Sequence, residues 1–397
     1  MDEPSAQLQL DMRAAVINAL SSRRPVLHHL NADSSWLLQI PRPESASRRG
    51  GRFYYNILID PWLAGGQSDV AKWFSTQYHA EKSKIGSIAA VEELLRSTET
   101  LASGLRLGAG RTSDVAENPE NGEVGSFIDV VAIGHEFTDH CHQETLMDVN
   151  PDVPVLAADK AADIIRKWSH FRVVHTIPLF TQKSSDWRAT SVPPLPEWLG
   201  ISRLITKGEH VNLHAAMMIT FNNGFERSKL VVVDGESSGV ESNDTKHGSF
   251  GEEDTAEAVI YTPHGIKCPD LALVPSATPP IETLALLHGL HDVSLNLGQQ
   301  INLGGHNGLQ AQRLLDAKYW IGTHDEIKDG HGMIGMFLRR KVISVEDALK
   351  DENRRSAGQN GHILDGSGED DKSDWALSGY KEAHWNDIGN GESRVLL

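Results

Sequence analysis

The 397-residue sequence has little cysteine, no excess of positive charge and no long apolar run. Its two cysteines, Cys141 and Cys268, are too few for a disulfide framework and fit a reducing compartment. The formal net charge of −17 argues against a general affinity for phosphate-rich partners, so we expect no nucleic-acid partner. No stretch approaches the roughly 18 consecutive apolar residues of a membrane span, so we expect none.

The N-terminus also lacks the pattern of a secretory signal. Met1-Asp2-Glu3-Pro4 is acidic, and no apolar run of about 7–15 residues follows a basic stretch. Together with the scarcity of cysteine, this absence predicts a cytoplasmic protein.

What the sequence does contain is an ordinary globular composition, with 23% charged and 39% hydrophobic residues. We expect a single domain over residues 1–397. Two stretches rich in glycine, serine and acidic residues interrupt it: residues 235–257 are predicted to be an acidic mobile insertion, and residues 351–373 an acidic low-complexity loop.

Strand-like and helix-like runs alternate along most of the chain. Short apolar runs predict strands at 26–30, 35–40, 53–59, 128–133, 153–157, 173–177, 216–221, 230–233, 258–261, 271–274 and 319–323. Helices are predicted at 7–21, 85–97, 161–168, 281–290 and 309–315. This alternation predicts the α/β fold class.

The densest group of potential metal ligands follows the predicted strand at 128–133. It consists of His135, Asp139, His140 and His142. The carboxyl end of a strand is where α/β proteins place functional groups, and imidazole with carboxylate suits zinc better than calcium or magnesium. The alternative interpretation is a histidine-rich surface turn, or polar residues that cap the next helix.

Three phrases in combination resemble the metallo-β-lactamase superfamily: His135 to His142 (HEFTDHCH), Tyr261 to Ile266 (YTPHGI) and Gly322 to Glu326 (GTHDE). They look like a fungal branch related to the lactonase-like and phospholipase-D-like members, over roughly residues 25–345. The resemblance implies a four-layer αβ/βα sandwich with a metal at the edge between the two sheets.

The resemblance also implies the site residues. The implied metal ligands are His135, Asp139, His140, His214, His264 and His324, with His210 as a competitor of His214. Asp60 matches an aspartate that supports the metal ligands from behind, although it could simply form a turn before Pro61. Asp325 could orient His324, or could be a solvated charge.

The sequence departs from the resemblance at two positions. Phe137 stands where the motif has a histidine, and His264 stands where the superfamily has a carboxylate that bridges two metals. Phenylalanine cannot bind a metal, and imidazole bridges poorly. The remaining ligands favour one zinc ion, with His135 and His214 left for other work; two metals, or iron or manganese, are the alternatives.

The expected function is a metal-dependent hydrolase that uses a metal-bound hydroxide on an ester, lactone, amide or phosphodiester of a small to medium-sized molecule. Asp139, His135 or His214 would accept the proton. One alternative is a degenerate, non-catalytic member that binds a ligand or a structural metal, which Phe137 and a closed four-ligand site would favour. The other is an oxygen-using iron protein.

Overall fold

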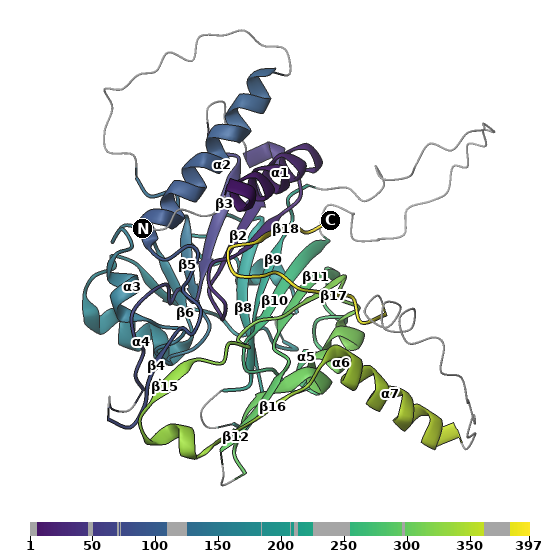
Figure 1. Ribbon diagram of the computed structural model, residues 1–397. Helices are drawn as coiled ribbons and strands as arrows, with labels where there is room; N and C mark the ends of the chain where they lie inside the picture. Colours follow the sequence, from purple (N-terminus) through teal and green to yellow (C-terminus); the bar gives the residue numbers. More distant parts are fainter. Residues whose placement is uncertain are drawn as a thin grey trace, which may run out of the picture.

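The computed structural model describes residues 6–46, 51–69, 71, 73–108, 125–183, 185–206, 208–209, 213–224, 255–295, 298–360 and 382–397. Within them, two β-sheets face each other, and helices cover the outer face of each sheet (Figure 1). This arrangement confirms the predicted four-layer αβ/βα sandwich.

The first sheet has seven strands in the order β18-β1-β2-β3-β5-β6-β7. Its first four strands pair antiparallel, whereas β3, β5, β6 and β7 run parallel. The bounds are β1 (Val26–His29), β2 (Trp36–Pro41), β3 (Tyr54–Ile59), β5 (Val130–Ile133), β6 (Val155–Ala157), β7 (Val174–Thr176) and β18 (Ser393–Val395).

The second sheet has six strands in the order β17-β14-β11-β10-β9-β8. Its bounds are β8 (Leu199–Ile205), β9 (Ala215–Phe221), β10 (Ala256–Thr262), β11 (Ile281–His288), β14 (Tyr319–Ile321) and β17 (Trp385–Asn386). Strands β10, β11, β14 and β17 run parallel. Two smaller sheets are formed by β13 (Gln300–Leu303), β12 (His291–Leu295) and β16 (Leu338–Val342), and by β4 (Thr76–Tyr78) with β15 (Asp329–His331).

The helices are divided between the two outer layers. Helices α2 (Ile88–Gly108), α3 (Gln143–Met147) and α4 (Asp159–Trp168) pack on the first sheet. Helices α5 (Cys268–Leu271), α6 (Gly304–Leu315) and α7 (Val345–Asn360) pack on the second. Helix α1 (Ala6–Ser22) contacts β1 and β18. Short 3₁₀ helices are η1 (Glu44–Ala46), η2 (Trp187–Thr190) and η5 (Met333–Met336).

The alternation of side chains along the strands explains the layers. In β3, Ile57 and Ile59 belong to the core between the two sheets, whereas Leu58 belongs to the core beneath the helices. Each such buried side chain contributes about 1.5–3 kcal/mol relative to an exposed one. With both faces of the sheets covered, the carboxyl ends of the parallel strands remain as the open edge for a site.

Two element types were predicted wrongly. The segment 281–290, predicted as a helix, is strand β11, which pairs on both sides with β10 and β14. A short apolar run does not distinguish a doubly buried strand from a buried helix. The segment 271–274, predicted as a strand, instead forms the last residue of helix α5, which has a proline in its first turn, and the turn that follows it.

The two acidic segments are only partly described. Helix α7 continues to Asn360, so residues 351–360 do not form the predicted loop. Strand β10 includes residues 256 and 257, the last two of the predicted insertion. Residues 235–254 and 361–373, and the predicted strand 230–233, lie outside the described residues. Among the described helices, none has the length and apolar content needed to cross a bilayer.

Candidate metal centre

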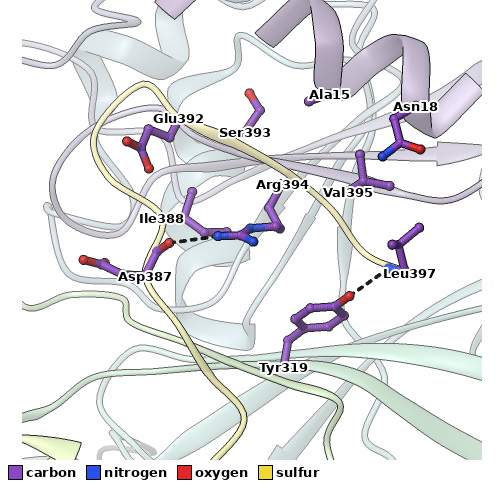
Figure 2. A pocket seen from close by; sticks show the side chains of 10 residues that line it. All are labelled: Ala15, Asn18, Tyr319, Asp387, Ile388, Glu392, Ser393, Arg394, Val395 and Leu397. Carbon is purple, nitrogen blue, oxygen red and sulfur yellow. Dashed lines mark hydrogen bonds between the residues drawn. The ribbon is translucent and has the colours of Figure 1, made fainter. Parts of the chain in front are cut away.

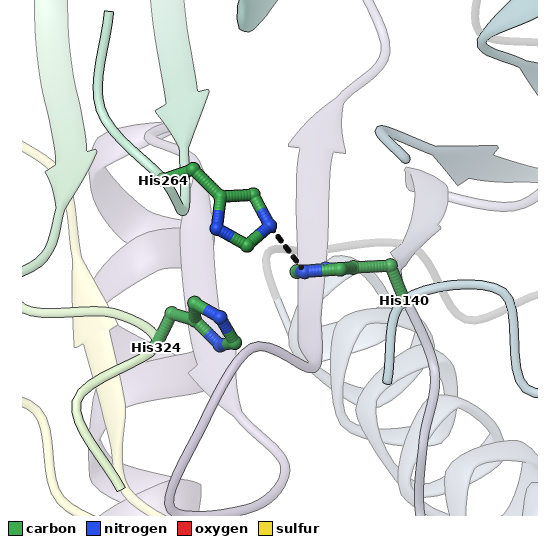
Figure 3. Close-up of side chains that lie close together, drawn as sticks. All are labelled: His140, His264 and His324. Atoms are coloured by element: carbon green, nitrogen blue, oxygen red, sulfur yellow. Dashed lines mark hydrogen bonds between the residues drawn. The ribbon is translucent and has the colours of Figure 1, made fainter. Parts of the chain in front are cut away.

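Three histidine rings meet at the open edge of the sheets (Figure 3). His140 follows β5 of the first sheet, while His264 and His324 follow β10 and β14 of the second. One ring nitrogen from each lies within 4.8 Å of the other two. The Nε2 atoms of His140 and His264 are 3.1 Å apart, and all three residues are buried.

The far nitrogen of each of these rings is held by an oxygen atom. The contacts are His140 Nδ1 to Asp60 Oδ2 at 2.8 Å, His264 Nδ1 to Asn302 Oδ1 at 2.9 Å, and His324 Nδ1 to Asp33 Oδ2 at 3.1 Å. Carboxylate and amide oxygens accept hydrogen bonds, so each Nδ1 donates and each Nε2 is left with a lone pair.

This donor set fits a divalent metal ion. Lone pairs that face each other at 3.1 Å repel unless a proton or a metal ion lies between them. Two nitrogens that bind one tetrahedral zinc ion are about 3.3 Å apart, close to this separation. An oxygen acceptor behind each ligand histidine is the usual arrangement around a protein-bound metal. His140, His264 and His324 could therefore hold one ion such as zinc.

The charges around His264 and His324 agree with this assignment, whereas those around His140 favour a protonated ring from which a metal ion would displace the proton. Burial, together with the neighbouring rings of His324 and His140, holds the pKa of His264 well below its usual value. Burial also lowers the pKa of His324. For His140, Asp139 and Asp60 outweigh the effect of burial and raise the pKa. His264 and His324 are thus neutral near pH 7, which is the form that binds metals.

Asp60 connects the centre to both sheets. Its Oδ2 contacts His140 and accepts a hydrogen bond from the hydroxyl of Tyr261, while its Oδ1 accepts one from the backbone N–H of Gly134. The backbone φ angles of Asp60 and His324 are 43° and 61°, in the left-handed region that few residues other than glycine adopt.

Asp139 is shared between the centre and a lysine that the sequence did not reveal. Its Oδ1 lies 3.8 Å from His140 Nε2, and its Oδ2 accepts a hydrogen bond from Lys328 Nζ at 2.8 Å. The same ammonium lies 2.9 Å from Asp33. Burial lowers the pKa of Lys328, but the two carboxylates outweigh it and raise the pKa above its usual value.

His135 lies beside the three rings but is held differently. Its ring centroid is 5.4 Å from that of His264, and it stacks on Phe137 at 4.2 Å. The backbone N–H of Phe137 donates to His135 Nδ1 at 3.2 Å, so in the neutral ring the proton is on Nε2. That Nε2 is buried without a hydrogen-bond partner among the described residues.

His214 is held by Glu209 through its Nδ1 at 2.7 Å. Its Nε2 is buried and, within the described ranges, has no hydrogen-bond partner. His210, the competing candidate, is outside the described residues.

Asp325 does not have the expected position. Its carboxylate accepts hydrogen bonds from the backbone N–H groups of Leu290 and His291, and the carboxylate next to the His324 ring is that of Asp33. The expectation came from adjacency in the sequence, but His324 and Asp325 point to different neighbours because the chain turns sharply at the left-handed His324.

Asp33, Asn302 and Lys328 also belong to the centre, although nothing in the sequence predicts it. Asp33 lies in a turn between two strands, where aspartate is common for reasons unrelated to metals. Asn302 is in β13, far from the motif phrases. Lys328 comes four residues after His324, but only its placement beside Asp139 reveals a role.

Of two cavities, one borders the metal centre and the other lies apart from it. His135 and His264 line one of about 10 Å³, which has room for roughly one water molecule. Figure 2 shows another, of about 330 Å³, between helix α1, Tyr319 and the segment 387–397. None of the metal-centre side chains described above lines the larger cavity.

No model of a known protein family matches the sequence, and no curated protein matches it. Solved structures with a similar fold include a possible metal-dependent hydrolase from Veillonella parvula, with 12% identity over 94% of this chain and 100% of that chain and a TM-score of 0.48. An isothiocyanate hydrolase from Delia radicum gut bacteria has 12% identity over 94% and 99%, with a TM-score of 0.44. The metallo-β-lactamase fold protein YhfI from Bacillus subtilis has 11% identity over 93% and 98%, with a TM-score of 0.36. Likeness at this level carries no argument about activity, so the case for function rests on the geometry of the centre.

Proposed function

We propose that this chain is a metal-dependent hydrolase with one divalent ion, zinc by preference, held by His140, His264 and His324. The observation that carries the proposal is the shared orientation of these rings, each with Nδ1 on an oxygen acceptor and a ring nitrogen close to the other two. The relation to the metallo-β-lactamase superfamily and its fungal branch belongs to the proposal and is supported by the motif phrases and the four-layer architecture.

When bound, such an ion supplies Lewis acidity, which activates water and polarises the group to be cleaved. Two further histidines, His214 and His135, are proposed to do the remaining work. His214 is suited to accept a proton, because Glu209 fixes its Nδ1 and leaves a lone pair on Nε2. His135 is suited to donate a hydrogen bond to a developing oxyanion, because its Nε2 carries the proton. This replaces the expectation that His135 accepts the proton.

The substrate class is an ester, lactone, amide or phosphodiester of a small to medium-sized molecule, because these are the bonds that Lewis acidity and a proton acceptor together hydrolyse. A cytoplasmic location and the absence of a nucleic-acid partner are part of the same proposal, supported by the two cysteines and the net charge of −17.

A four-substrate panel with one member of each class tests this function. The zinc-loaded protein is expected to hydrolyse at least one member, to lose that activity on treatment with a chelator, and to regain it with zinc. His264→Ala is expected to be inactive, while His28→Gln, a change at an equally buried histidine of the first sheet, should remain active. Activity that survives metal removal, or that His264→Ala retains, would contradict the proposal.

A non-catalytic protein that holds a ligand or a structural metal is the second candidate. The cavity beside His135 and His264, only about 10 Å³, favours it because a substrate needs more room. Retention of one metal ion by wild-type protein that hydrolyses none of the four substrate classes would support this candidate instead.

A further inference from the structure

Lys328 places a positive charge against two buried carboxylates next to the metal centre. Its Nζ lies 2.8 Å from Asp139 Oδ2 and 2.9 Å from Asp33 Oδ2, and its side chain is 8% exposed. Asp33, Asp139 and His324 form a second group whose ligand atoms lie within 4.8 Å of one another. The group that resembles a second metal site therefore already contains a cation.

The surrounding chain fixes the ammonium in this place. Residue 328 immediately precedes β15, which pairs with β4, and the ammonium lies 5.2 Å from the centre of the Trp62 ring. Before Lys328 in the chain, Glu326 forms a hydrogen bond with His79 at 2.6 Å, and the His79 ring stacks on that of Trp62. Because the chain is fixed both before and after Lys328, its ammonium is a built part of the site and not a mobile surface charge.

We propose that Lys328 is a fixed internal cation that takes the place of a second metal ion and so restricts the centre to one metal. Removing one partner from a buried ion pair leaves an uncompensated buried charge, which is strongly destabilising. Without the ammonium, Asp33 and Asp139 would need another cation. Two carboxylate oxygens suit an oxygen-binding ion such as Mn²⁺, whereas the three imidazoles suit zinc.

Lys328 also explains how the centre keeps a position open for substrate. The ammonium binds Asp139 Oδ2, and the other carboxylate oxygen of Asp139 lies 3.8 Å from His140 Nε2, so Asp139 is committed to Lys328 and not to the three rings. The three histidines then supply three ligands, which is the number that leaves a catalytic zinc ion one open position. This step rests on the proposed function; the restriction to one metal does not require hydrolysis.

The test is a Mn²⁺ titration of zinc-loaded protein, followed by electron paramagnetic resonance and elemental analysis. Lys328→Gln is expected to retain one zinc ion and to bind one Mn²⁺ ion in addition. Wild type and Lys328→Arg, which keeps the positive charge, are expected to bind zinc alone. One zinc ion and no Mn²⁺ in Lys328→Gln would overturn the proposal, as would a Mn²⁺ ion bound equally by wild type.

The variants are purified both with and without Mn²⁺, since Lys328→Gln needs a replacement cation. If Lys328→Gln is insoluble in both cases, the double variant Asp33→Asn/Lys328→Gln is tested in its place, because it loses one charge of each sign. It is expected to bind zinc alone, and a bound Mn²⁺ ion would contradict the proposal. A wild type that binds no zinc would refute the proposed function and leave the comparison of Mn²⁺ binding intact.

Discussion

The three histidines of the metal centre lie beside a fourth, His135, which differs from them in what holds the nitrogen that faces away from the centre. His140, His264 and His324 each direct Nδ1 to an oxygen acceptor, which leaves Nε2 free to bind a metal. In His135, Nδ1 accepts a backbone N–H, so Nε2 carries a proton. Proximity alone does not make a histidine a ligand, because the partner of the far nitrogen decides which nitrogen has the lone pair.

His214 makes the comparison sharper. Glu209 holds the Nδ1 of His214, just as oxygen acceptors hold the Nδ1 atoms of the three ligand histidines. Among the described residues, however, His214 belongs to neither of the two clusters of potential ligands, His140/His264/His324 and Asp33/Asp139/His324. His214 has a lone pair on Nε2, but no other histidine with such a lone pair lies close to it among the described residues. A single histidine of this kind is better suited to accept a proton than to hold a metal.

The largest expected effect is on zinc affinity, when removal of one of the three ligand rings is compared with removal of His135. His264→Ala or His324→Ala should weaken zinc binding by more than about a hundredfold, because one of three ligands is lost. His135→Ala should change it by less than about threefold, since this ring does not bind the ion. Competition with a chromophoric chelator measures both affinities. Equal losses of zinc affinity in His135→Ala and His264→Ala would show that His135 also binds the metal.

A smaller effect is expected from the acceptors behind the rings. Asn302→Ala removes the oxygen that holds His264 Nδ1, and it should weaken zinc binding by roughly ten- to a hundredfold. Asn302→Asp keeps an oxygen acceptor and should stay close to wild type. Glu209→Gln, behind His214, should leave zinc affinity unchanged. A loss in Glu209→Gln as large as that in Asn302→Ala would mean that His214 also binds the metal.

A separate effect, on stability and not on zinc affinity, is expected from a buried histidine outside the metal centre. His28 bonds Ser393 and Gln39 through its two nitrogens, and burial lowers its pKa to about 4. Since the unfolded chain takes up this proton near pH 6.5, His28 contributes stability above pH 6.5 that is lost as the pH falls toward 4. The full loss is about 3 kcal/mol.

Urea unfolding of wild type and His28→Gln at pH 7 and pH 4.5 measures this contribution. The free energy of unfolding should fall less between the two pH values in His28→Gln, by roughly 2–3 kcal/mol. An identical fall in both proteins would show that folding does not lower the pKa of His28.

The strand–helix pattern was sufficient for the α/β class, and the resemblance of the motif phrases implied the four-layer architecture and part of the centre. Strands β3, β5, β10 and β14 could be predicted because their apolar runs are short and bounded, and His140, His264 and His324 follow three of them. The helix predicted over β11 failed because a strand buried on both faces has no alternation to read.

The residues that distinguish the histidines from one another could not be predicted. Asp33, Asn302 and Lys328 come from turns and small sheets, and their roles depend on which nitrogen or oxygen they touch across the fold. The tautomer of His135 depends on a backbone N–H of Phe137. Contacts of this kind depend on side-chain orientation, which neither residue type nor spacing specifies.

Anomalous X-ray diffraction from crystals of the zinc-loaded protein tests the central claim most directly. The account predicts one zinc peak per chain, about 2.0–2.1 Å from the Nε2 atoms of His140, His264 and His324. A peak bound by His135 or His214, or two zinc peaks in the wild-type protein, would contradict it.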